Sequence, residues 1–161
     1  MNIVTRITVG TIFAFIFSAL PLIFYAISDS WERYYLESTP REEFFHYIST
    51  LPIKDQFRIG EDITLASILE VYKPLTFYWN DRLWCDLDDD DKGFHLVGRH
   101  IDELYSEPII RTDENPSRWD YTGRLPNATG DCYILSVIDA DVGQGVIKTQ
   151  TIQSGPFEII E

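Results

Sequence analysis

The sequence predicts an all-β body, a sandwich of about seven short strands, preceded by one N-terminal transmembrane helix. Three observations carry this prediction. The stretch Ile7–Ile27 holds no charged residue, alternating apolar runs with frequent turn residues follow it, and Cys85 and Cys132 each lie inside a strand-like run. A period of two is typical of half-buried strands, and no convincing amphipathic helix interrupts the series.

The apolar stretch is long enough to cross a membrane. A helix rises about 1.5 Å per residue, so Ile7–Ile27 would cover a hydrocarbon core of roughly 30 Å, and a membrane helix tolerates the internal Pro21 with a kink. Arg6 is the only charged residue before Asp29. The positive-inside bias then places the N-terminus in the cytoplasm and the body in the periplasm or outside the cell. We expect a single-pass membrane protein that contacts the lipid bilayer through Ile7–Ile27.

A cleaved signal peptide is the alternative for the same stretch. Ala26-Ile27-Ser28 resembles a small-residue cleavage site, but the apolar run exceeds the usual 7–15 residues of a signal peptide. We therefore favour a retained anchor or uncleaved signal over residues 1–28. A polar, aromatic stalk would follow at 29–41, and the extracytoplasmic sandwich domain at 42–161.

The body is strongly acidic. The chain carries 13 basic and 26 acidic residues, and everything after the anchor has a formal charge of −14 because only Arg6 precedes it. We expect no nucleic-acid binding, because such an acidic surface repels phosphates and no basic stripe offsets this repulsion. The acidic surface keeps the body soluble and would attract a basic partner.

The first strands follow from alternation and proline positions. Glu42–Ile53 alternates loosely and contains Pro52, which predicts a first strand near a sheet edge. In Asp62–Val71 four aliphatic residues share one parity, and this predicts a half-buried strand. Leu75–Cys85 repeats the pattern, with Asn80-Asp81 as a tight turn or bulge in the middle.

The middle of the body is broken by polar segments. Asp86–Gly93 is a charge run that predicts a solvated loop or a ligand site. Phe94–Ile101 resumes a short strand, and Leu104–Ile110 predicts another. Arg111–Gly130 is rich in Asp, Asn, Pro, Ser and Gly, which indicates a long connection with a short strand at Trp119–Tyr121.

The last third reads as a central strand and its neighbours. Asp131–Ile138 has apolar residues on both parities, which predicts a strand covered on both faces. Val142–Gly145 predicts a hairpin turn that returns through Val146–Ile152. Phe157–Ile160 ends the chain as a final pairing segment.

The two cysteines are expected to form a disulfide, because an exported body enters an oxidising compartment. We expect an inter-sheet bridge between Cys85 and Cys132 that would stabilise the fold by roughly 4 kcal/mol in the chain-entropy model. Two free buried thiols are the alternative. A metal site would need more ligands than a cysteine pair supplies.

Four segments of the body have a pattern that points to a known type of domain: Ile59–Leu65, the Trp79/Cys85 pair, Gly130–Ile134 and Ser154–Ile159. Through them the body resembles an immunoglobulin-like sandwich, and the combination with an N-terminal anchor is similar in style to small membrane proteins encoded by bacteriophages. Antibody-type domains place a core Trp after the first Cys and a Tyr two residues before the second. Here Trp84 directly precedes Cys85, and Gly130 stands two residues before Cys132.

A calcium site is the sharpest local candidate, because clustered carboxylates suit a hard cation. The candidate ligands are Asp86, Asp88 and Asp90, with Asp89 and Asp91 between and after them. Against the EF-hand template, Asp91 stands where glycine belongs and Val97 where glutamate belongs. A solvated loop is therefore the favoured interpretation, calcium is a candidate only, and no other cofactor is expected.

No catalytic constellation emerges from the sequence, so we expect a protein that is not an enzyme. His95 and His100 have opposite parity on one strand and are expected to point to opposite faces, which separates them as a metal or acid–base set with Asp102. No nucleophile elbow, phosphate loop or zinc-protease motif is present.

Trp119 and Tyr121 are the candidate contact residues, because they lie in a polar connection whereas most aromatic residues of a strand-rich body belong to its core. The sequence therefore favours a membrane-anchored, non-enzymatic protein-interaction or structural module, associated with a phage or a cell envelope, with an unidentified protein partner. A sandwich that binds a carbohydrate or small ligand, assisted by calcium, is the alternative.

Overall fold

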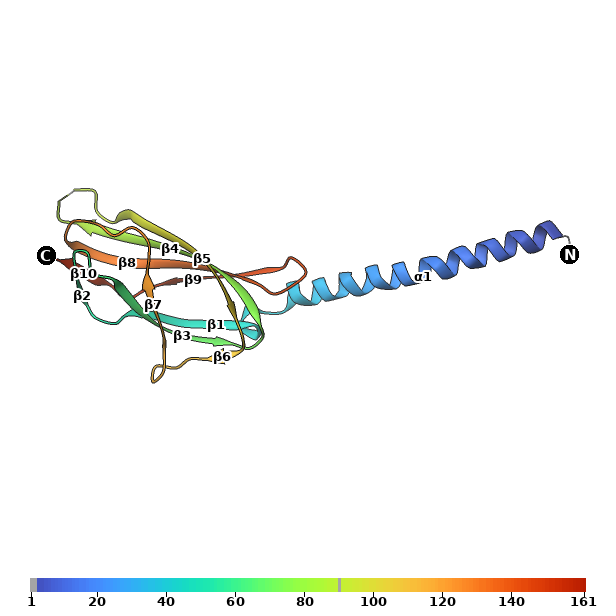
Figure 1. Cartoon of the computed structure of the whole chain (residues 1–161), viewed down its shortest axis with the longest axis horizontal. Helices are drawn as coiled ribbons and strands as arrows, with labels where there is room; N and C mark the ends of the chain where they lie inside the picture. Colours follow the sequence, from blue (N-terminus) through green and yellow to red (C-terminus); the bar gives the residue numbers. More distant parts are fainter. Residues whose placement is uncertain (1–2, 90) are drawn as a thin grey trace. The chain divides into compact units, whose positions relative to one another are not determined.

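The computed structural model describes residues 3–89 and 91–161, with side chains from Phe17 onward, and divides the chain into two compact units between Thr39 and Pro40. The first unit is one helix, and the second, here called the β unit, consists of strands (Figure 1). In chain order the elements are α1 (Ile3–Ser38), η1 (Arg41–Glu43), β1 (Phe45–Pro52), β2 (Gln56–Arg58), β3 (Ile63–Val71), β4 (Leu75–Leu87), β5 (His95–Ser106), β6 (Ile109–Ile110), β7 (Ser117–Tyr121), β8 (Gly130–Asp141), β9 (Ile147–Gln153) and β10 (Phe157–Ile160).

The helix α1 continues through most of the predicted stalk. Arg33 and Glu37 form an i,i+4 ion pair at 2.9 Å, which favours a helix. The Thr39 hydroxyl donates to the carbonyl oxygen of Tyr35 at 2.7 Å, satisfying one acceptor of the last turn, and Pro40 then prevents continuation.

Among the described residues, no helix is both long enough and apolar enough to cross a membrane. Residues 7–16 of the predicted anchor Ile7–Ile27 lie outside the residues whose side chains are described.

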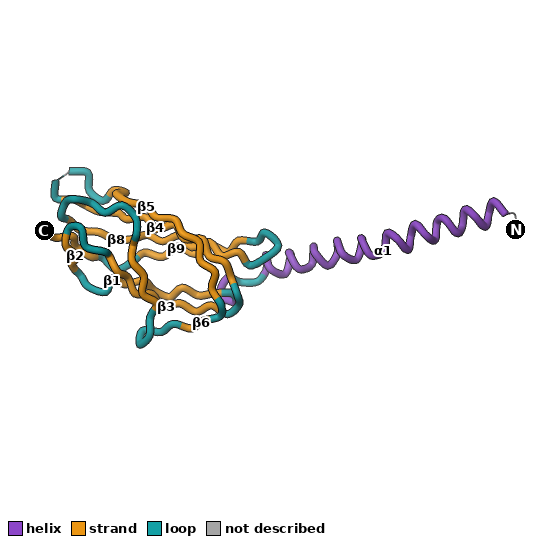
Figure 2. The backbone as a smooth tube through the Cα atoms, viewed as in Figure 1, coloured by secondary structure: helices purple, strands orange, loops and turns teal. Residues whose placement is uncertain are grey.

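The β unit is built from two sheets, as expected for an all-β body (Figure 2). In the first sheet β3 pairs with β1 on one side, and with β7 and β6 in succession on the other. In the second sheet the strand order is β2-β10-β8-β4-β5, and β9 also pairs with β8. The strand β8 is central, as its two apolar faces predicted, because β4 lies on one side and β10 and β9 share the other.

One pair of sheet edges is joined by side-chain and backbone hydrogen bonds. Gln150 of β9 donates from Nε2 to the carbonyl oxygen of Tyr47 at 2.6 Å and accepts from the Tyr47 amide at 3.2 Å. The Gly155 amide donates to the carbonyl oxygen of Thr50 at 3.2 Å. At the opposite pair of edges, β5 pairs with β4 alone among the described strands, so no strand pairing joins the two sheets there.

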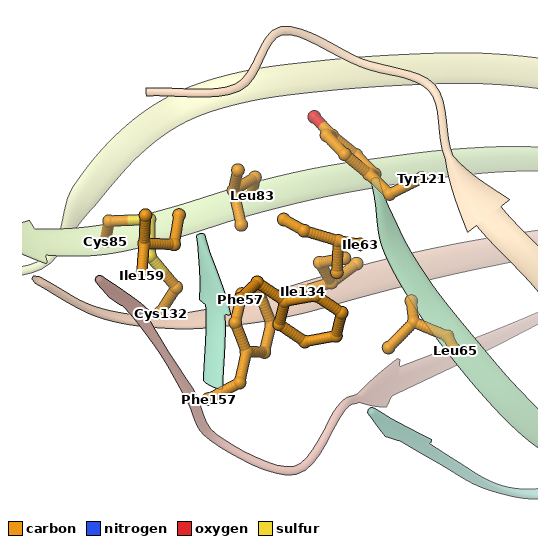
Figure 3. Close-up of a cluster of buried hydrophobic side chains, with 10 residues drawn as sticks. All are labelled: Phe57, Ile63, Leu65, Leu83, Cys85, Tyr121, Cys132, Ile134, Phe157 and Ile159. Atoms are coloured by element: carbon orange, nitrogen blue, oxygen red, sulfur yellow. A yellow bond between two sulfur atoms is a disulfide. The ribbon is translucent and has the colours of Figure 1, made fainter. Parts of the chain in front are cut away.

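The disulfide between Cys85 and Cys132 is confirmed, but its predicted inter-sheet position is wrong. The two cysteines are register partners on neighbouring strands β4 and β8 of one sheet, with Cα atoms 4.2 Å apart. That spacing is near the separation of a non-hydrogen-bonded antiparallel pair. Both side chains are buried inside the apolar cluster of Figure 3. The bridge therefore fixes the register of two strands instead of clamping two layers.

Two predicted breaks in the strands are absent. Asn80-Asp81 is not a turn, because β4 runs through it and Asp81 pairs in register with Ser136 of β8. The segments Phe94–Ile101 and Leu104–Ile110 are not separate strands, since β5 runs continuously to Ser106 and a short β6 follows.

Candidate functional site

A buried carboxyl group lies on the inner face of the second sheet. Asp81 is only 3% exposed, and the Ser136 hydroxyl on the neighbouring strand donates to its Oδ1. Burial raises the pKa of Asp81, the neighbouring Asp102 raises it further, and His100 and the Ser136 hydrogen bond oppose the shift. Asp81 is thus a carboxyl group held in a place where its charged form is costly.

The facing sheet supplies a matching set of polar groups. The Tyr47 hydroxyl donates to Oγ of Ser67, which also accepts from Nε1 of Trp119 at 2.8 Å. The Thr50 hydroxyl donates to the Tyr47 hydroxyl at 2.8 Å. Burial raises the pKa of Tyr47. These hydrogen bonds satisfy the buried hydroxyls and hold the Trp119 ring in place.

A hollow of about 280 Å³ opens between the sheets at the edges that no strand pairing joins, between β5 and β7. Its walls include Tyr47, Trp79, Asp81, His100, Asp102 and Trp119. A second hollow of about 180 Å³ shares Trp79 and Leu104 with the first and continues to Phe77 and Ile109. We call the two together the edge groove. The first hollow is its polar end and the second its apolar end.

The polar end is closed by the segment that follows β7. The Thr122 hydroxyl lies 3.0 Å from Nδ1 of His100. A Cβ atom at Gly98 would stand 2.1 Å from the carbonyl oxygen of Arg124, so only glycine permits this approach of the two backbones. The edge groove is therefore covered beside His100, and β5 is left uncovered further along.

A bulge in β5 overturns the prediction that His95 and His100 point to opposite faces. Gly98 pairs with Leu83 and Leu96 pairs with Trp84, so Val97 is an extra residue that reverses the parity. His100 and His95 consequently pair with Asp81 and Cys85, which lie on the same face of β4. The two partners are four residues apart along β4, about 13 Å, and the histidines line different hollows, so they still do not form one set.

The two predicted contact residues have different surroundings. Both belong to the short strand β7, as expected, and share its parity. Trp119 is half-buried and lines the edge groove, so it remains a candidate contact residue. Tyr121 is 2% exposed and belongs to the apolar cluster (Figure 3), where burial raises its pKa to about 12. It is not available for direct contact with a partner.

The candidate calcium ligands do not converge within the described part of the chain. Asp86 is exposed at the end of β4, and Asp88 accepts a hydrogen bond from the Thr129 hydroxyl at 2.6 Å. Asp90 lies outside the described residues. No group of three His, Cys, Asp or Glu residues able to hold a metal ion occurs among the residues that are described.

Sequence reasoning missed Asp81 as a site residue although a signal was present. Asp81 has the same parity as Leu75, Phe77, Leu83 and Cys85 in β4, and this parity faces the interior. A single carboxyl group in an inward-facing apolar series indicates a buried acid with a partner.

Comparison with known proteins leaves the chain without a family assignment. No family model matches it, and no curated protein is similar in sequence. Among solved structures, a chain from one titled "Structural basis of T cell specificity and activation by the bacterial superantigen toxic shock syndrome toxin-1" aligns with a TM-score of 0.30 and 10% identity, covering 71% of this chain and 98% of that chain. A likeness this distant carries no argument about function.

Proposed function

We propose that this chain is a membrane-anchored, non-enzymatic, extracytoplasmic binding module whose β unit binds a protein partner along the edge groove. The observation that carries the proposal is the unpaired edge of β5. From this strand His100, Asp102, Leu104 and Ser106 line the groove, and Leu104 is 53% exposed. An exposed, apolar edge strand is a template for pairing with another chain unless it is covered. An extended segment of a partner is the natural cover.

The membrane part of the proposal rests on the N-terminal unit. In α1 large apolar side chains are exposed around the helix, with Phe17 at 69% and Leu22 at 71%. A helix that is apolar all round is one that buries its surface in a bilayer or another protein. The disulfide supports export of the β unit, because oxidising compartments preserve such bonds. Association with a phage or a cell envelope stays a prediction from the sequence.

We also propose that the β unit is an immunoglobulin-like sandwich. In support, β1, β3 and β7 form one sheet, while β4, β5, β8 and the final strands form the other. The variable-type immunoglobulin domain divides its strands in the same way, because its strands C, C′, F and G form one sheet. The disulfide within one sheet is the departure from that type.

The non-enzymatic part of the proposal rests on how the hydroxyls are used. Ser67 is engaged by Tyr47 and Trp119, and Ser136 donates to Asp81. A serine nucleophile needs a general base that accepts its proton and a site beside it for substrate. Asp81 is suited to hold Ser136 in place, and its burial hinders the charged form that a base requires.

Two measurements test this function. A reporter that is active only outside the cytoplasm, fused after Glu161, should be active, and a cytoplasmic reporter should be silent. A photo-crosslinking residue at Leu104 should capture one discrete protein in native membranes, whereas one at Ile147, similarly exposed at 47%, should not. Equal labelling at both positions, or none at Leu104, would overturn binding at the groove.

A second candidate is a carbohydrate or small ligand in the same groove. Trp79 and Trp119 present half-buried rings beside the Asp81 and Asp102 carboxyl groups, and stacking with hydrogen bonding is how such ligands are held. If glycan binding required Trp119 and no protein crosslinked at Leu104, this candidate would replace the first.

A further inference from the structure

The polar end of the edge groove has the composition of a cation site. We propose that the partner inserts a lysine or arginine side chain there, followed two residues later by an apolar side chain in the apolar end. This inference rests on the function proposed above and gives the chemistry of its partner.

Asp81 provides the first argument. Its side chain is buried, and Ser136 donates to Oδ1. No hydrogen bond to Oδ2 is found among the described residues, and Asp81 lines the hollow. A buried carboxylate without a second donor is stabilised by a cation that enters beside it, since charge-assisted hydrogen bonds are stronger than neutral ones.

The walls of the polar end favour a cation over a neutral group. Asp102 adds a second carboxyl group to the same hollow. The rings of Tyr47 and Trp79 are in contact, with centroids 5.4 Å apart, and Trp119 of β7 lines the same hollow. Aromatic rings attract ammonium and guanidinium groups that lie over their faces.

The basic residues at the hollow do not cancel these acids. Arg118 alternates with Trp119 along β7 and is exposed, so its side chain lies on the opposite face of that strand from the Trp119 ring. His100 is the other basic residue at the hollow, and its Nδ1 lies 3.0 Å from the Thr122 hydroxyl at the closed side of the polar end. The acidic body adds a long-range attraction for a basic partner.

The spacing of the two ends sets the partner's pattern. The polar end lies at the Trp79–Asp102 pair of the β4–β5 ladder, and the apolar end lies at the Phe77–Leu104 pair, two residues along. Two residues of a strand span about 6.6 Å, and side chains at i and i+2 of an extended segment point the same way. A segment of the form basic–x–apolar that runs parallel to β5 therefore fits both ends at once, because Asp102 precedes Leu104 along that strand.

The test uses the full-length protein in detergent and neutral-ended peptides. The probe has Lys–Ser–Leu at its centre, and the matched peptides replace Lys by norleucine or glutamate, or Leu by serine. Binding is followed by tryptophan fluorescence and titration calorimetry. We expect the Lys–Ser–Leu peptide to bind about tenfold or more tightly than each matched peptide.

Three variants with the same change in net charge locate the site. Asp81→Asn and Asp102→Asn should each weaken binding of the Lys–Ser–Leu peptide about tenfold, while Asp131→Asn, on an exposed position of β8, should change it less than twofold. Thermal unfolding of each variant confirms that it is folded. Asp102 is exposed and serves as the second reporter if Asp81→Asn does not fold.

The outcomes separate the two proposals. Equal weakening by Asp131→Asn, or no preference for lysine over norleucine, would overturn the cation site. If a free diamine bound as tightly as the peptide, the site would be one for small cations, and the inference would also fail. Crosslinking at Leu104 without any lysine preference would leave the proposed function standing and overturn only its chemistry.

Discussion

The interior of the β unit is apolar at one end and partly polar at the other. Around the disulfide the facing residues are wholly apolar and almost fully buried, with Leu83 and Ile134 at 0% exposure (Figure 3). Around the edge groove the same strands β4 and β8 supply Asp81 and Ser136, and the rings of Trp79 and Trp119 are only half-buried. One inward-facing series of residues thus provides both stability and a binding surface. The sheet edges also differ. Hydrogen bonds connect the two sheets between β1 and β9, whereas no strand pairing connects them between β5 and β7.

The largest expected effect comes from removing the covalent bond of the apolar end. The Cys85→Ala/Cys132→Ala double variant should lose about 4 kcal/mol of unfolding free energy, because the bridge joins residues 47 apart in sequence. Guanidinium unfolding of the full-length protein, followed by tryptophan fluorescence, measures this loss. A loss below about 1 kcal/mol would mean that the apolar packing alone holds that end together.

Truncating one side chain at each end should sharpen the contrast. Ile134→Ala at the apolar end should cost about 3 kcal/mol, since a buried aliphatic side chain leaves a cavity. Leu104→Ala at the groove should cost less than about 1 kcal/mol, because that side chain is already 53% exposed. The same unfolding experiment measures both. Equal losses would show that the groove is part of the core.

The last effect has the opposite sign. The folded protein raises the pKa of Asp81 above its unfolded value, so the folded state binds the proton more tightly and stability falls as pH rises through the unfolded and then the folded pKa. Above both pKa values this cost is fully present, and Asp81→Asn should there be stabilising by about 1 kcal/mol. Unfolding curves from pH 3 to 7 should show the advantage shrinking towards the acid end. A variant that is destabilised equally at every pH would contradict this assignment.

Local alternation was enough to predict the strands but not their neighbours. The parity of Asp62–Val71 predicted β3, and the two apolar faces of Asp131–Ile138 predicted a central strand, because burial acts on each strand separately. The bond between Cys85 and Cys132 was predicted, but not that both lie in one sheet, because the order in which strands pair is a property of the whole fold. The bulge at Val97 was invisible for the same reason, and it reversed the expected orientation of the histidines.

The candidate site was predictable only in part. Trp119 was singled out from its polar surroundings and does line the groove, but Tyr121, two residues on, has the same parity and reaches the apolar cluster. Asn80-Asp81 looked like a turn because both residues favour turns, but the ladders with β5 and β8 on either side hold the segment in a strand, and the Ser136 hydroxyl satisfies the Asp81 carboxyl group there. Tertiary partners decided each of these cases.

The hydrogen bonds between Gln150 and Tyr47 have a mechanical consequence. They attach the first sheet to the second along β1 and β9, and the Gly155–Thr50 bond extends that seam. On the far side the sheets are connected by the chain itself, which passes from Ser106 of β5 to Ile109 of β6 through two residues, and by the approach of Arg124 to Gly98. The opening between β5 and β7 is therefore bounded at both ends, and its length limits how much of an extended partner segment it can take.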